Sequence, residues 1–358
     1  MLAWVGSAFV LHHLALPGRS RPWPIAATPA WTVLPVLLLE AVHGAFTMDH
    51  VFVAGGWLVW PVLLVLHAVM LRRLDGGPPA PWWPWVHAGG VWLLVLLVGN
   101  AMVFAIGRAG LWQTAWASVI LLVSGTLVLL LLARRRWFES EGLRWPLHGF
   151  ARAYLWLAAA PLALVVALGA LLVAVASDGN ARPLPYVPLL NPTDLAVAVA
   201  LAACALWLVR LRESPLPVPA AMRERAWLLG LAAIVFVAIN TVWLRVAHHF
   251  FGVPWDAQAL FASFLVQAGY SILWTLLALA LMVGAFRRGW RGVWTLGAGL
   301  LGATVLKLFV IDLSNRGGSE RIFVFIAVGL LMLVVGYFAP IPPAARPAPD
   351  AAPEGAGS

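Results

Sequence analysis

The chain has 358 residues, of which 63% are hydrophobic and only 10% are charged. Soluble domains are about 45–50% apolar and about 25% charged. So much apolar surface cannot be hidden in a soluble core, which excludes a cytosolic enzyme, a nucleic-acid-binding module and a secreted disulfide scaffold. The net charge of +9 is divided into small clusters between apolar runs, a pattern typical of a protein whose main partner is the lipid bilayer.

A helix that spans a bilayer needs about 20 mostly apolar residues. On that criterion the sequence predicts an all-α fold, a polytopic transmembrane helix bundle of about eleven spans that occupies residues 1–339. A disordered, Pro/Ala-rich cytoplasmic tail is expected over 340–358. The expected spans are 2–16, 31–46, 51–71, 85–106, 112–133, 153–176, 194–211, 226–246, 260–286, 293–311 and 322–339.

The basic residues orient these spans. Alternate loops hold seventeen arginines on one side and five on the other. Because positive residues stay on the cytoplasmic side, the C-terminus is predicted to be cytoplasmic. The near-exclusive use of arginine, with Lys307 as the one lysine, and the richness in Ala, Gly and Pro resemble a GC-rich bacterial coding bias, so a bacterial cytoplasmic membrane is the expected location. The first span then begins outside with almost no residues before it, so either that span is irregular or the chain is a piece of a longer protein.

Two local patterns favour structural roles. GAGLLG, with Gly297, Gly299 and Gly302, matches a dinucleotide-binding fingerprint but lies in an apolar helix, where small residues allow close helix packing. Asn191 is predicted to cap a helix that starts at Pro192. The single cysteine, Cys204, forms no disulfide or metal motif, and neither a metal nor a cofactor is predicted.

Ionisable groups at membrane depth are costly and indicate function by default. Glu40 and His43 share one helix face, and Asp49 follows in the outside turn. Glu40 lies about 9 Å from the outer end of its span, at 1.5 Å per residue. The pair either satisfies itself or supplies a catalytic carboxylate, for which Glu40, His43 and Asp49 are the candidates.

Two further groups are candidates for substrate binding, both predicted on the outer side. Arg245 closes one span and is followed by His248 and His249, so that it is either an interfacial anchor or a contact for an anion. Lys307 lies about one turn inside another outer end and either snorkels, joins an ion-pair network or belongs to a site. Asp312 and Arg321 crowd the turn that follows it.

A stripe of polar residues at i+4 spacing runs along the predicted span over 260–286. Such a row either forms hydrogen bonds to a neighbouring helix or lines a pathway. The stripe consists of Ser263, Gln267, Ser271 and Thr275.

The block HHFFGVPWD, the segment SILWTLLALALMVGAFRRGWRGVW and the later LLGATVLKLFVIDLSNRGGSERIF resemble the end of domain-of-unknown-function family 2339, a family of predicted bacterial membrane proteins. The resemblance covers residues 240–343. The family has no established activity, so the resemblance implies an architecture and a membrane location rather than a reaction. Its recognisable block includes Arg245, His248, His249, Gly252, Trp274, Lys307, Asp312 and Arg321.

The leading hypothesis is an outward-facing polar site that handles an anionic envelope-side or lipid-linked substrate. In it Glu40 or Asp49 acts as base or counter-ion, while Arg245 and Lys307 hold an anionic group. A transporter or flippase is an alternative that needs the polar stripe as a path across the membrane. A non-catalytic scaffold or assembly partner, with every polar group paired internally, is the other. The sequence leaves open whether the protein is an enzyme.

Overall fold

The structure, a computed structural model, describes residues 2–15, 31–47, 50–53, 55–75, 81–134, 145, 149–224, 226–308, 310, 322, 326, 329–330 and 333. Every regular element within these ranges is a helix, which confirms the predicted fold class. The chain divides into two compact units, Met1–Val242 and Trp243–Ser358. Each unit is described by itself.

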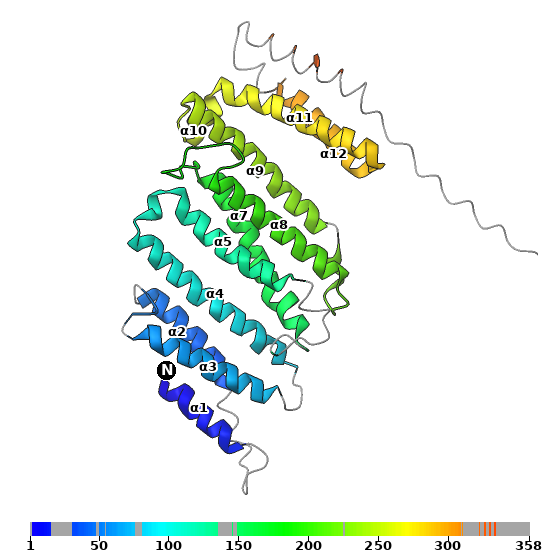
Figure 1. The fold of residues 1–358 in the computed structure, drawn as a ribbon. Coiled ribbons are helices and arrows are strands. Elements are labelled where there is room, and N and C mark those ends of the chain that lie inside the picture. The colour runs from blue at the N-terminus through cyan, green and yellow to red at the C-terminus, as the bar shows by residue number, and fades with distance from the viewer. Residues whose placement is uncertain are drawn as a thin grey trace, which may run out of the picture. The chain divides into compact units, whose positions relative to one another are not determined.

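The first unit is a series of helices that pack beside one another (Figure 1). Its helices are α1 (Leu2–Ala15), α2 (Val33–Thr47), α3 (Gly56–Leu74), α4 (Trp83–Arg108), the short 3₁₀ helix η2 (Leu111–Gln113), α5 (Ala115–Leu132), the π-helix η3 (Ala153–Ala158), α7 (Ala159–Ala176), α8 (Pro192–Glu213), the 3₁₀ helix η4 (Ala220–Arg223) and the first part of α9 (Ala226–Phe251).

The second unit holds the rest of α9, followed by α10 (Ala257–Ala262), α11 (Phe264–Arg288) and α12 (Arg291–Lys307). Helices α11 and α12 form an antiparallel hairpin and lie side by side (Figure 1). Gly289 closes the hairpin with φ +67°, a left-handed conformation that glycine adopts without steric cost. The hairpin brings Lys307, at the end of α12, beside the first turns of α11.

Each of the first ten predicted spans is largely helical. Seven helices in the described part of the chain are long and apolar enough to cross a membrane, and α2 is a shorter apolar helix. The predicted span over 260–286 is divided, because Ser263 ends α10 and its hydroxyl accepts from Val266 N to cap α11. Most of the predicted span 322–339 and the tail 340–358 lie outside the described residues.

The core of the first unit lies where α5, α7 and α8 pack together. Its contact faces carry small residues such as Ala163, Ala200 and Ala203, which are nearly fully buried and allow the helix backbones to approach closely. The opposite face of α7 exposes large apolar side chains, and Leu172 is 67% exposed. A helix that is apolar on all sides is typical of a protein whose solvent is lipid.

The two local packing and capping predictions can be compared directly with the structure. Asn191 caps α8 by accepting a hydrogen bond from Thr193 N at 2.9 Å, as predicted. Of the three glycines in GAGLLG, Gly297 alone makes a close helix contact, since a Cβ there would lie 2.7 Å from Met282. A Cβ on Gly299 or Gly302 would meet nothing within 4 Å, so the packing role belongs to Gly297.

Candidate functional site

Arg245 is the largest fully buried side chain in the described part of the chain, with 1% of its surface exposed. It lies on α9 two residues after Trp243, whose indole N–H donates to Val266 O on α11 at 3.2 Å. A Cβ on Gly269 would lie 2.1 Å from the Trp243 ring, so the indole packs directly on the α11 backbone. This contact fixes the Arg245 segment of α9 against the beginning of α11.

Lys307 is also buried, with 8% of its surface exposed. Its Nζ donates to Gln267 O at 2.9 Å and to Ser271 Oγ at 3.0 Å, both on α11. The ammonium therefore points at the neighbouring helix and does not snorkel to the surface. The same contacts show that the polar stripe of α11 faces α12, as one of the two interpretations of that stripe predicts.

Further hydrogen bonds of the stripe are local, and Gln267 Nε2 donates to Phe261 O of α10 at 3.0 Å. Ser271 Oγ also donates to Gln267 O at 3.3 Å, and Thr275 Oγ1 donates to Ser271 O at 2.7 Å. Ser271 and Thr275 are fully buried. Because Val266 accepts from Trp243 and Gln267 accepts from Lys307, the segments that carry Arg245 and Lys307 meet the same turn of α11.

His248 and His249 form the last turn of α9 beside this group. His248 Nδ1 donates to Val253 O at 2.7 Å, which fixes its ring on the turn after the helix. His249 is exposed, and the two rings make an edge contact with centroids 4.9 Å apart. The histidines are therefore neighbours at the helix end, with one ring held by backbone and the other on the surface.

The predicted acidic group lies in the other unit. Glu40 is half-buried and His43 is exposed on α2, so they do not form a buried pair. Asp49, Asp312 and Arg321 lie outside the described residues. Arg245, His248, His249 and Lys307 thus belong together within the second unit, while Glu40 and His43 belong to the first.

The first unit contains a polar network that sequence reasoning misses. At the end of α3, Asp75 accepts hydrogen bonds from the indoles of Trp83 and Trp145 and lies 3.1 Å from His87 Nε2. His87 Nδ1 lies 3.0 Å from Tyr154 Oη. His87 is 1% exposed, so three separate segments of chain meet at one buried imidazole.

The bonding pattern of this network fixes the proton positions. A carboxylate accepts only, so His87 Nε2 must carry the proton that it donates to Asp75. In the neutral ring Nδ1 is then the acceptor, and the Tyr154 hydroxyl donates to it. The ring of Phe150 stacks on His87 with centroids 3.8 Å apart, which covers the imidazole. Asp75, His87 and Tyr154 form a continuous hydrogen-bonded chain.

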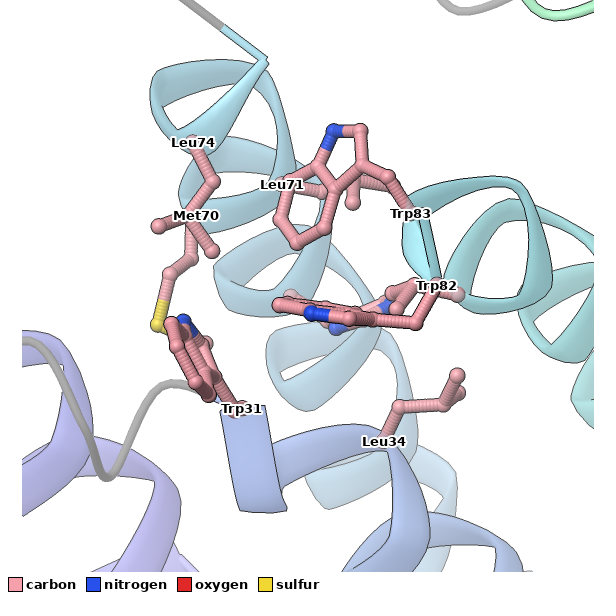
Figure 2. A pocket seen from close by; sticks show the side chains of 9 residues that line it. Trp31, Leu34, Met70, Leu71, Leu74, Trp82 and Trp83 are labelled. Atoms are coloured by element: carbon pink, nitrogen blue, oxygen red, sulfur yellow. The ribbon is translucent and has the colours of Figure 1, made fainter. Parts of the chain in front are cut away.

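A pocket adjoins this network on the other side of Trp83. Figure 2 shows the rings of Trp31, Trp82 and Trp83 around it, with Met70 on α3. The space between its lining side chains, mouth included, is about 260 Å³. His67 lines it and is 8% exposed, and neither of its ring nitrogens has a hydrogen-bond partner within the described residues.

One feature of the sequence could have pointed to Asp75, His87 and Tyr154. Asp75 follows one predicted span, whereas His87 and Tyr154 stand near the beginnings of two later spans. Alternating topology places all three at the same membrane face. The candidate groups identified from the sequence are all predicted at the opposite face, and the tryptophans around Asp75 match the pattern of an interfacial belt.

Long apolar helices with a few buried, bonded polar groups define an α-helical integral membrane protein. The family model described as "Predicted membrane protein (DUF2339)" matches residues 1–342. The chain therefore belongs to this family, and the match extends well before the resemblance noted over 240–343. No curated protein and no solved structure matches the chain.

Proposed function

We propose that the second unit binds the anionic group of a lipid-linked or envelope-side substrate through Arg245 and Lys307. The observation that carries this proposal is the burial of two cationic side chains, 1% and 8% exposed, in chain segments that meet the same turn of α11. A cation at membrane depth is costly, and such residues commonly mark substrate or ion pathways. Guanidinium and ammonium groups are the usual partners of phosphate and carboxylate.

The contacts of Lys307 also support a second candidate, a structural tie between α11 and α12. Two acceptors of its ammonium, Gln267 O and Ser271 Oγ, are neutral oxygens of α11. In that case the buried lysine holds the hairpin together and binds no ligand, as in the scaffold hypothesis. The two candidates predict different responses to an added anion, so binding measurements separate them.

The proposal also includes the side of the membrane that this site faces. With the C-terminus in the cytoplasm of a bacterial cell, the end of α9 and the beginning of α11 face the outside of the cytoplasmic membrane, where envelope precursors are handled. The predicted role of Glu40, His43 and Asp49 as base or counter-ion stays a prediction, as does a transport path.

The test uses the full chain in neutral-lipid nanodiscs and a photoactivatable dodecyl phosphate whose labelled peptides are identified by mass spectrometry. We expect labelling of α9, α11 or α12 that dodecyl phosphate displaces and dodecanol does not. Lys307→Met and Arg245→Gln should each reduce this labelling about tenfold or more, because each removes one charge-assisted hydrogen bond to the anion. Arg287→Gln, which removes an exposed charge from the other end of α11, is the matched control.

Two results would overturn the proposal. One is labelling of the second unit that dodecanol displaces as well as dodecyl phosphate, because the anion then contributes nothing. The other is unchanged labelling in well-folded Lys307→Met and Arg245→Gln proteins, which would favour the structural tie. The competition on the wild-type protein decides the matter even if a variant fails to fold.

A further inference from the structure

The pocket beside Trp83 lies where three helices of the first unit end or begin. Trp31 precedes α2, and Trp82 and Trp83 stand at the beginning of α4 (Figure 2). His67 lies on α3. Tryptophans at helix ends are typical of the membrane–water interface. The pocket is therefore placed where the polar end of a lipid meets its apolar chain.

His67 differs from the other buried histidine of this region. Both ring nitrogens of His87 are engaged, by Asp75 and Tyr154. His67 is only 8% exposed, yet both of its ring nitrogens are unpartnered within the described structure. Buried polar groups are normally hydrogen-bonded, and each exception requires an explanation. A bound group that faces His67 in the pocket supplies one.

The size of the pocket limits that group. Its enclosed part has room for about one water-sized group, whereas the remaining space is open. A buried water needs two to four polar partners. Among the described lining side chains the imidazole of His67 supplies the only nitrogen or oxygen acceptor, because the others are aliphatic, thioether or indole groups. An oxygen tethered to an apolar body fits these walls better than free water.

The depth and chemistry of the pocket argue against a charged group. His67 lies seven residues before Leu74, the end of α3, or about 10 Å along the helix at 1.5 Å per residue. An anion at that depth would need a cation, and the described lining contains none. Three indole rings attract quaternary ammonium groups, but such a group has no N–H or acceptor to offer His67. A hydroxyl or carbonyl oxygen satisfies the imidazole without charge.

We propose that this pocket binds a neutral lipid, with its hydroxyl or carbonyl oxygen hydrogen-bonded to His67. The apolar body of the lipid lies along Trp31 and Trp82, whose ring centroids are 4.8 Å apart. Trp31 is 53% exposed and forms the mouth through which the chain enters. Trp83 separates the lipid from Asp75, to which its indole donates. The site is independent of the anion site proposed for the second unit.

The test uses the full chain in nanodiscs with a long-chain alkanol that carries a diazirine in its chain. After irradiation, mass spectrometry locates the labelled residues. We expect labelling of the segments that contain Trp31 and Trp82, displaced by dodecanol and about tenfold less well by dodecane, dodecyl phosphate or dodecyltrimethylammonium. Stronger displacement by the ammonium would overturn the proposal in favour of an aromatic cation site, and stronger displacement by the phosphate would overturn it in favour of an anion site.

Variants address His67 itself. His67→Phe should reduce alkanol labelling about tenfold, because an aromatic ring remains while both nitrogens are lost. His12→Phe is the matched control, since His12 lies on α1, is 5% exposed, has two ring nitrogens without a partner among the described residues and is not part of the described lining. Equal labelling of a folded His67→Phe protein and the wild type would refute the role of the imidazole. The competition series on the wild-type protein tests the site without either variant.

Discussion

His87 and Asp75 are twelve residues apart in sequence, and their side chains meet at 3.1 Å where α3 ends and α4 begins. Asp75 accepts from His87, Trp83 and Trp145, while His87 accepts from Tyr154. One carboxylate and one imidazole thereby connect α3, α4, the segment at residue 145 and η3. This junction organises one end of the first unit.

We expect Asp75→Asn to destabilise the first unit by about 3 kcal/mol, because hydrogen bonds to charged groups contribute roughly 1.5–3 kcal/mol each. An asparagine offers one oxygen and turns an N–H toward groups that also donate. Thermal unfolding of the detergent-solubilised protein measures the loss. Trp83→Phe removes one donor and should cost less. An Asp75→Asn protein as stable as the wild type would show that the carboxylate charge is not needed.

Tyr154→Phe should cost about 1–3 kcal/mol of unfolding free energy, because it leaves His87 Nδ1 buried without a donor. Tyr270→Phe is the matched control, since the Tyr270 hydroxyl takes part in no hydrogen bond within the described residues. Parallel denaturation curves provide the comparison. Equal effects of the two substitutions would mean that the bond to His87 contributes nothing measurable.

Gly269→Ala should destabilise the second unit by about 1–3 kcal/mol or more, the usual cost of overpacking. The added Cβ would lie 2.1 Å from the Trp243 ring. Gly284→Ala, on the same helix, meets nothing within 4 Å and should stabilise α11 by about 0.5–1 kcal/mol. Hydrogen exchange across α11 resolves the two effects. The contact would be disproved if both alanines were tolerated alike.

Ser271→Ala removes one acceptor of the Lys307 ammonium and should cost about 1–3 kcal/mol. Lys307→Met removes the donor to Ser271 Oγ and Gln267 O and should also cost about 1–3 kcal/mol. In the double variant most of the Ser271→Ala cost should disappear, a coupling that a double-mutant cycle measures. Additive effects would argue that the hydroxyl and the ammonium do not interact in the membrane.

The parts of the fold that follow from hydropathy can be predicted from the sequence, and those that depend on contacts between distant segments cannot. The spans are predictable because about 20 apolar residues suffice to cross a bilayer, and the cap at Asn191 is predictable from the adjacent Pro192. The i+4 spacing of Gln267, Ser271 and Thr275 predicts a polar helix face.

Contacts between segments give no comparable signal. Nothing in the spacing of Asp75, His87 and Tyr154 indicates that they touch, because loops of unknown path separate them. The sequence predicts that Arg245 either anchors its helix at the membrane interface or contacts an anion. The structure shows that Arg245 is one of the most buried side chains among the described residues. Burial of a helix-end residue depends on what packs over it, which no single segment encodes.

The π-helix η3 has a consequence for how this family can vary. Each π turn holds more residues than an α turn, so Ala153–Ala158 contains chain length that a regular helix would not need. Leu155 O and Ala158 O in this segment accept the indoles of Trp207 and Trp92. Deleting one residue there would regularise the helix and turn Tyr154 away from His87 by about 100°, the angle of one residue at 3.6 residues per turn. Among members of the family, the length of this segment should therefore covary with the identity of the residue at position 87.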